Sequence, residues 1–185
     1  MKKFPAVLAL LLSHSVGAAD SYTIDPTHTY PSFEIGHMGF SIQRGFFERT
    51  RGNIIIDWEN KTGSIDVEID AASIYTGNAT RDENLRSENF FDVANYPTIT
   101  YKSRQLEFQD DRLVRVKGEL SIRGIANPVE LTISHFECGY NLLKLAHGCG
   151  ADAITAIQRS DYAFVSFLPP LGDQVWLRIQ VEAYK

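Results

Sequence analysis

The sequence has no excess of positive charge, only two cysteines and, after its first residues, no hydrophobic run long enough to span a membrane. It contains 23 acidic side chains against 18 Lys and Arg, and its formal net charge is −5. A negative surface does not favour phosphate backbones or anionic bilayers, so we expect no nucleic acid partner. Because a transmembrane helix needs about 20 predominantly apolar residues in a row, we also expect no stable membrane insertion.

Motifs of the common hydrolase and oxidoreductase classes are absent as well. The chain contains no G-x-S-x-G, H-E-x-x-H or C-x-x-C sequence. Its five histidines do not stand at an interpretable spacing from acidic residues. We therefore predict that the protein is not an enzyme and has no catalytic residues. An unrecognised barrel enzyme, with an active site assembled from distant residues, is an alternative that sequence leaves open.

The first residues have the three parts of a secretory signal peptide. Two lysines are followed by an apolar segment, residues 4–12, and then by small residues that lead to Ala18 and Ala19. Such a segment is too short to anchor a protein in a bilayer and is removed during export, here near Ala18 or Ala19. We therefore predict a signal peptide at residues 1–19, a periplasmic protein, and one domain at residues 20–185.

The two cysteines, Cys138 and Cys149, both lie in the part predicted to be exported. In an oxidising compartment a close pair of this kind forms a disulfide, which stabilises by about 2 to 3 kcal/mol on a chain-entropy estimate. An alternative uses the neighbouring His135 and His147, since thiolate and imidazole suit zinc or copper. The spacing matches no established metal motif, so the disulfide is favoured. A metal- or redox-linked accessory protein that uses this loop remains the competing hypothesis.

Alternation of apolar and polar residues, which is typical of strands with one covered face, dominates the rest of the chain. Between residues 80 and 93 this period fails, and Leu85, Glu88 and Phe91 stand at helical spacing instead. Many short strands joined by local turns, with one helical insertion, predict an all-β, antiparallel up-and-down barrel of about eight strands. The alternating apolar sets are Ile65, Val67 and Ile69; Ile99 and Tyr101; Val114 and Val116, continuing with Leu120 and Ile122; Val129, Leu131 and Ile133; and Val175, Leu177, Ile179 and Val181.

Nine short segments of the chain stand out as motifs when they are taken in order. They are YTIDPTH (22–28), FEIGH (33–37), GF (39–40), GF (45–46), TGNATRDENLRSENFFD (76–92), YPTITYKS (96–103), GELSIRG (118–124), PV (128–129) and RSDY (159–162). Together these segments resemble the YceI-like family of exported lipid-binding proteins, and the resemblance runs from about Tyr22 to the C-terminus. Between Cys138 and Cys149 the chain is similar to a cysteine-containing branch of the family, with an unusually leucine-rich centre at residues 140–146.

This resemblance implies a lipocalin-like, extended barrel that binds a long isoprenoid lipid or an isoprenoid quinone in its interior. The expected function is that of a periplasmic binding or carrier protein, with the apolar isoprenoid as its partner and no catalytic cofactor. Alternation alone does not separate a ligand cavity from a solid core. Pairing of two barrels into a homodimer is also left open by the sequence.

Aromatic and aliphatic side chains are the candidates for the wall of the ligand site, because an isoprenoid chain binds by removal of apolar surface from water. Ordinary core packing is an equally good explanation for each of them. The candidates are Phe33, Ile35, Phe40, Phe46, Phe90, Phe91, Ile99, Tyr101 and Tyr162.

Three polar residues complete the predicted site. His37 follows the inward register of its strand and is either a core histidine or a hydrogen-bond donor to a quinone carbonyl or lipid head group. Arg81 and Arg159 are candidates for contact with a polar or phosphate head. The more frequent role for such arginines is structural, here through Arg–Asp pairs with the neighbouring Asp82 and Asp161.

Overall fold

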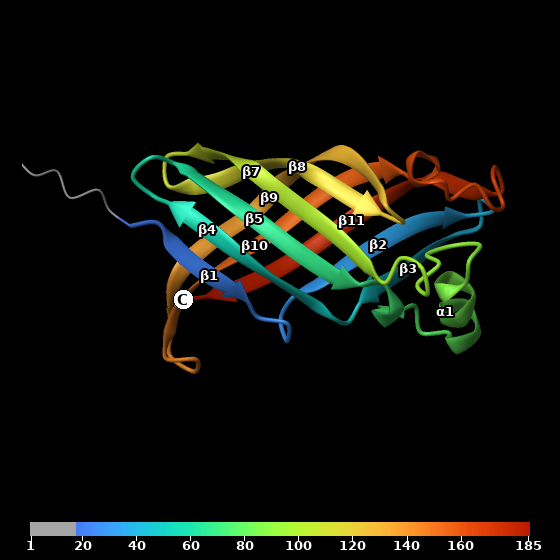
Figure 1. The fold of residues 1–185 in the computed structure, drawn as a ribbon, viewed down its shortest axis with the longest axis horizontal. Helices are drawn as coiled ribbons and strands as arrows, with labels where there is room; N and C mark the ends of the chain where they lie inside the picture. The colour runs from blue at the N-terminus through green and yellow to red at the C-terminus, as the bar shows by residue number, and fades with distance from the viewer. Residues whose placement is uncertain (1–17) are drawn as a thin grey trace, which may run out of the picture.

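The computed structural model describes residues 18–185, and these residues form an antiparallel β-barrel with one short α-helix (Figure 1). The predicted signal peptide lies outside the described residues except for its last two, Ala18 and Ala19. The strands are β1 (Asp20–Ile24), β2 (Tyr30–His37), β3 (Ser41–Phe47), β4 (Thr50–Asp57), β5 (Thr62–Asp70), β6 (Ile74–Tyr75), β7 (Thr98–Gln109), β8 (Arg112–Ile122), β9 (Ile125–Asn141), β10 (Ala146–Gln158) and β11 (Leu171–Tyr184). The helices are the 3-10 turns η1 (Ala71–Ser73) and η2 (Arg159–Tyr162) and the α-helix α1 (Ala79–Arg86).

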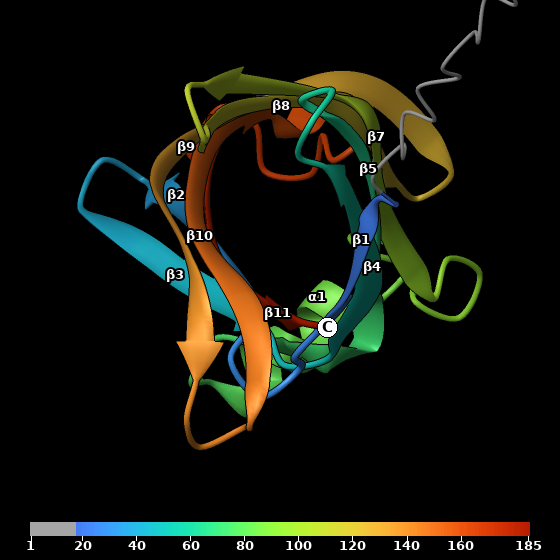
Figure 2. The same ribbon diagram turned by 90° about the vertical axis from the view of Figure 1, so that its left-hand side faces the viewer.

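Eight strands close the ring in the order β1-β4-β5-β7-β8-β9-β10-β11. The first and last strands meet through Thr23 opposite Tyr184 and Ile24 opposite Ala183. Figure 2 shows this ring nearly along its axis. The predicted up-and-down barrel of about eight strands is therefore confirmed, and closure leaves the ring without an exposed edge.

The three remaining strands extend the barrel toward one end. β2 pairs with the first part of β11, β3 pairs with β2, and the two-residue β6 pairs with β3. β1 and β2 therefore act as one interrupted strand along β11, with the break at residues 25–29. Helix α1 lies at this extended end, while the C-terminus lies at the other (Figure 1).

Helix α1 begins where the sequence supplies a cap. The side chain of Asn78 accepts a hydrogen bond from the backbone N–H of Arg81 at 3.0 Å, as a good N-cap does. The buried carboxylate of Asp82 accepts from Thr76 N and Oγ1 at 2.9 and 2.6 Å. The prediction of helix within residues 80–93 is correct for its first half only, because the chain leaves the helix after Arg86 and continues in turns.

Strand alternation places the apolar sets inside, as predicted, with one exception. Ile65, Val67, Ile69 and their counterparts on the other strands face the barrel interior. At β8, a register shift against β7 falls between Glu107 and Phe108. Because of this bulge Leu113, and not the expected Val114, is buried and faces inward.

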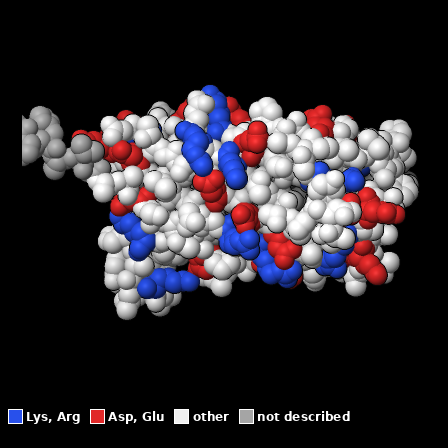
Figure 3. All heavy atoms as spheres, in the orientation of Figure 1, with Lys and Arg blue, Asp and Glu red and all other residues white. Residues whose placement is uncertain are grey.

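Most charged side chains lie on the outside of the barrel, where many of them pair across strands. On the face shown in Figure 3, positive and negative residues are intermingled over the middle of the barrel. The pairs on or next to β4, β5 and β7 include Arg49–Asp70, Arg51–Glu68 and Arg104–Asp66, with Arg49 directly before β4. No helix among residues 18–185 is long and apolar enough to cross a membrane.

Candidate functional site

The barrel encloses a cavity of about 610 Å³ whose wall is almost wholly apolar. That volume is within the usual range for small-molecule sites, about 300–1,000 Å³. Side chains from every strand of the ring contribute to the wall. Those from the middle of the barrel include Ile56, Ile69, Val116, Leu120, Val129, Leu131, Ala153, Leu177 and Ile179.

Most of the residues that the sequence nominated for the ligand site line this cavity. Ile99, Tyr101, Arg159 and Tyr162 are buried in its wall, whereas the others are half-buried. Burial raises the pKa of the Tyr162 hydroxyl to about 12, so this side chain stays neutral at physiological pH. The nominated residues on the lining are Phe33, Ile35, His37, Arg81, Phe90, Phe91, Ile99, Tyr101, Arg159 and Tyr162.

Phe40 and Phe46 do not line the cavity, and their prediction as wall residues is wrong. Phe40 is 91% exposed in the turn between β2 and β3. Phe46 lies on the outer face of β3, where its ring packs against Tyr30 at 5.8 Å and Tyr75 at 5.3 Å between centroids. Since neighbouring residues of a strand point to opposite faces, the inward position belongs to Phe47.

Tyr101 shows how a polar side chain is kept from disturbing the apolar wall. Its hydroxyl lies 3.1 Å from the carbonyl oxygen of Val129 and 3.3 Å from that of Val116, to which it can donate. Its ring covers Gly118, where a Cβ atom would approach the ring to 2.6 Å. Burial raises the pKa of Tyr101 far above its usual value, so the hydroxyl keeps its proton for these bonds.

Aromatic side chains close the end of the barrel that contains Asp20 and Lys185. The ring of Trp58 packs against Phe108 at 6.0 Å and against Phe136 at 6.2 Å. The indole N–H of Trp58 donates to Asp20 at 3.0 Å, and Lys185 donates to the same carboxylate at 2.6 Å. We refer to this region as the closed end.

The opposite end of the cavity is bordered by polar side chains and by loops. His37 lies at the last position of β2, and Gln43 of β3 accepts a hydrogen bond from Arg81 of α1. Phe167, which is 67% exposed, also belongs to the cavity lining. An exposed lining residue marks the opening of the cavity, and we refer to this region as the open end.

Arg159 is committed to the backbone and is not available for a ligand head group. Its guanidinium donates to the carbonyl oxygens of Phe164 at 2.7 Å, Gly172 at 2.9 Å and Leu171 at 3.4 Å. The expected Arg159–Asp161 and Arg81–Asp82 pairs are not formed. Arg159 therefore has a structural role here, but its partners are a carbonyl group of the loop before β11 and those of the first two residues of β11.

Thr50 is a cavity residue that sequence reasoning missed. It is 4% exposed, it lines the cavity from β4, and its hydroxyl has no hydrogen-bond partner among the described residues. A buried hydroxyl without a partner carries a free-energy cost that a ligand oxygen would remove. The signal available in the sequence is weak, because Thr50 precedes the part of β4 where apolar residues stand out.

Cys138 and Cys149 form a disulfide between the directly opposed positions of β9 and β10. His147 packs its ring against Tyr140 at 5.1 Å on the same hairpin. His135 pairs with Asp152 in the ladder, an odd number of positions from Cys138, and so lies on the other face of the hairpin. The structure therefore does not bring these two histidines and two cysteines together as a metal site.

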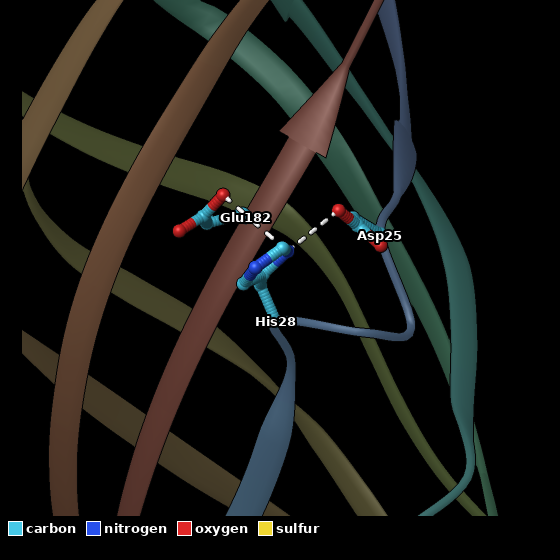
Figure 4. Close-up of side chains that lie close together, drawn as sticks. All are labelled: Asp25, His28 and Glu182. Carbon is cyan, nitrogen blue, oxygen red and sulfur yellow. Dashed lines mark hydrogen bonds and ion pairs between the residues drawn. The ribbon is translucent and has the colours of Figure 1, made fainter. Parts of the chain in front are cut away.

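Asp25, His28 and Glu182 are the residues that come close enough together to hold a cation in the described part of the chain (Figure 4). His28 Nδ1 lies 2.8 Å from Asp25 Oδ2 and 4.0 Å from Glu182 Oε2. The ammonium group of Lys144, which donates to Asp25 Oδ2 at 2.7 Å, already supplies a positive charge. This cluster is therefore a complete ion-pair network that joins β11 and the β9–β10 hairpin to the break between β1 and β2.

Asp25 is the most strongly perturbed acid of this network. Burial alone would raise the pKa of its carboxyl group. Hydrogen bonds from Lys144, Thr27 and His28 outweigh burial and hold this pKa well below its usual value. Asp25 is therefore ionised in the folded protein at any physiological pH, and its charge contributes to stability.

Comparison with known proteins agrees with this architecture. The sequence profile of the YceI-like domain matches residues 22–183. The chain belongs to the YceI-like family. A UPF0312 protein of Photorhabdus laumondii is 30% identical over 180 residues, which cover 96% of this chain and 93% of the relative.

Solved structures of YceI-like proteins share the barrel. A YceI protein of Campylobacter jejuni is 26% identical, with a TM-score of 0.69 over 100% of this chain and 99% of that one. A polyisoprenoid binding domain from Saccharophagus degradans superposes with a TM-score of 0.67 at 17% identity, and the match covers 88% of this chain and 97% of that domain. The resemblance inferred from sequence motifs is thereby confirmed for the family and the fold.

Proposed function

We propose that this YceI-like protein binds a long isoprenoid lipid inside its barrel and carries it through the periplasm. The observation that carries the proposal is the cavity itself, with its apolar wall, one closed end and one open end. An apolar chain gains about 25 cal/mol for each Å² removed from water, without any need for hydrogen bonds. The chain would lie along the barrel with its head group near His37 and Arg81.

Two further observations support this choice of ligand and compartment. The structurally similar domain from Saccharophagus degradans is described as polyisoprenoid binding. The signal-like N-terminal segment and the Cys138–Cys149 disulfide both fit an oxidising compartment outside the cytoplasm. A wall with so few ionisable groups suits retention of a ligand, and we propose no catalytic step.

The direct test is mass spectrometry of an organic extract from protein purified out of the periplasmic fraction. A stoichiometric isoprenoid in the extract, chemically unchanged after incubation with the protein, supports the proposal. A folded protein that has no extractable lipid, and that does not take up an added polyprenol after delipidation, refutes it.

A substitution that fills the cavity provides a second test of ligand binding in the barrel. Ala153 faces the cavity from β10, whereas Ala156 of the same strand lies opposite the outward-facing Trp176. We expect Ala153→Trp to lower polyprenol affinity at least about tenfold, because the indole occupies space that the chain needs. Ala156→Trp, of equal size, should bind as the wild type does. If Ala153→Trp folds poorly, the smaller change Ala151→Leu, also on the cavity side, takes its place. It should lower polyprenol affinity by an intermediate amount.

Thr50 gives a reason to consider an isoprenoid quinone as the particular ligand. A quinone carbonyl could accept the hydrogen bond that the Thr50 hydroxyl does not make inside the protein. We expect Thr50→Val to weaken quinone binding about tenfold, as the loss of one hydrogen bond implies, and to leave squalene binding unchanged. Thr29→Val is the control, because the Thr29 hydroxyl also lies on the cavity wall but bonds to the backbone of Glu182. Equal loss for both ligands in Thr50→Val would exclude the quinone.

A further inference from the structure

Large apolar side chains are exposed around the open end of the barrel. They come from two segments: residues 38–42, which form the turn between β2 and β3 and the start of β3, and the loop that leads into β11. We call this set the apolar rim. Its members, with their exposed fractions, are Met38 (54%), Phe40 (91%), Ile42 (52%), Val165 (63%) and Phe167 (67%).

The two segments of the rim are neighbours in space although they are far apart in sequence. Met38 N donates to Pro170 O at 2.9 Å, and His37 stands opposite Leu171 in the sheet. Figure 1 shows both segments at the same end of the barrel, the end that carries α1. The rim is therefore one surface region formed by two loops held side by side.

The rim also lacks charge. Residues 38–42 and residues 163–171 contain no Asp, Glu, Lys or Arg, whereas ion pairs cover the sides of the barrel on β4, β5 and β7. Exposed apolar side chains that gather in one place, rimmed by polar residues, are characteristic of surfaces that contact a partner or a membrane. The absence of charge favours contact with apolar material over contact with a charged partner.

The rim is continuous with the cavity. Phe167 belongs to both, and its ring stacks on Phe90 with centroids 6.4 Å apart and an interplanar angle of 14°. Phe90 in turn lines the cavity, as does Leu171 at the start of β11. An apolar chain that leaves the cavity at this end would pass over aromatic and aliphatic side chains.

We propose that the apolar rim docks on the surface of a lipid bilayer, with Phe40 and Phe167 entering the boundary between head groups and acyl chains. The inference rests on the proposed function, because a barrel that carries an isoprenoid must exchange it with the membrane in which such lipids dissolve. A bilayer is favoured over a second copy of the chain, since a second barrel on the rim would cap the opening. Shallow insertion of this kind is driven by buried apolar area and needs no transmembrane segment.

The leucine-rich tip of the β9–β10 hairpin is the internal comparison. Leu142, Leu143 and Leu145 are 78%, 97% and 74% exposed. This hairpin lies at the closed end, where Trp58, Phe108 and Phe136 separate it from the cavity opening. Lys144 at its tip bonds to Asp25. The hairpin tip therefore exposes apolar side chains as the rim does, but it is not continuous with the opening of the cavity.

The test measures co-sedimentation of the mature protein with vesicles of neutral phosphatidylcholine. We expect the wild type to bind and to keep binding at about 1 M salt, where the Debye length is only about 3 Å. Phe40→Ser/Phe167→Ser should lower the vesicle partition coefficient at least about tenfold, since two aromatic side chains no longer leave water. Leu142→Ser/Leu143→Ser, the matched control, should stay within about twofold of wild type. Phe40→Ser alone, at a residue that is 91% exposed, keeps the test valid if the double variant folds poorly.

Uptake of polyprenol from detergent solution, measured on the same variants, separates this inference from the proposed function. The single variant Phe40→Ser, at a rim residue that does not line the cavity, should take up polyprenol normally from detergent but slowly from vesicles. Rim-dependent vesicle binding without any polyprenol uptake would leave the rim assignment standing and remove the proposed function. The rim assignment is overturned if the leucine variant is the one that loses vesicle binding, or if salt abolishes binding. It is equally overturned if the wild type is a dimer in solution that Phe40→Ser converts to a monomer.

Discussion

The two ends of this barrel are built differently. At the closed end, Trp58 packs against both Phe108 and Phe136, and Asp20 accepts hydrogen bonds from both Trp58 and Lys185. At the open end, the ring is continued by short strands, a helix and a loop that Arg159 holds through backbone carbonyls. The closed end is built from strands whose aromatic side chains pack together, whereas the open end also contains loops. These loops are held by hydrogen bonds from Arg159 and by aromatic contacts of Phe91 with Phe47 and Phe164.

This difference separates stability from access. Aromatic packing removes a large apolar area from water and therefore contributes much to the free energy of unfolding. Loops that are held by a few hydrogen bonds open at a lower cost than packed strands do. A protein that must retain an apolar ligand and also release it needs both kinds of construction, one at each end.

The largest expected effect is on the closed end. Phe136 is 6% exposed, and we expect Phe136→Ala to lower the free energy of unfolding by about 3–5 kcal/mol, because a large buried side chain leaves a cavity. Phe40→Ala at the open end removes the same ring from a 91% exposed position and should change stability by less than about 0.5 kcal/mol. Urea unfolding of both variants checks this, and equal losses would contradict the proposed difference between the ends.

An intermediate effect is expected for the arginine of the open end. Arg159→Met should lower the free energy of unfolding by about 1–3 kcal/mol, because buried carbonyl groups lose their donor. Hydrogen exchange should become faster in residues 163–172 and remain unchanged at the closed end. Arg112→Met, at an exposed position at the start of β8, is the control. Uniformly faster exchange would show that the open end is not a separate unit.

The smallest effect concerns the network that joins the β9–β10 hairpin to the break between β1 and β2. The pKa of Asp25 is lower in the folded protein than its ordinary value of 3.8. Its contribution to stability is therefore present above that value and is lost as the pH falls below it. We expect Asp25→Asn to cost about 1 kcal/mol at pH 7, with the difference from wild type shrinking below about pH 4. A difference that does not change between pH 7 and pH 2 would assign the loss to packing.

The inward faces of most strands could be predicted from the sequence, because alternation is a direct consequence of strand geometry. Val129, Leu131 and Ile133 of β9 face the cavity as expected. Prediction failed where one extra residue enters a strand. Because of the bulge near the β7–β8 turn, Leu113 and not Val114 takes the inward-facing position of β8. No sequence pattern marks where such a bulge falls.

The candidate site was predictable in its apolar part and much less so in its polar part. Strand period and motif resemblance together found Phe33, Ile99 and Tyr101. The partners of Arg81 and Arg159 depend on how loops distant in sequence meet, and neighbouring acids in the chain gave the wrong pairs. Phe46 was misplaced because Phe46 and Phe47 are both aromatic, so composition alone does not fix the register.

The closure of the ring has a consequence for the order in which the chain can fold. The first strand completes the barrel only through Thr23 and Ile24, which lie opposite Tyr184 and Ala183, the last two residues of β11. Contacts between positions so far apart in sequence form late and slow the folding of β-rich proteins. A chain that emerges N-terminus first therefore has no complete barrel until its last strand is available. Until then β1 presents an unpaired backbone edge, so the emerging chain needs protection from aggregation until β11 is available.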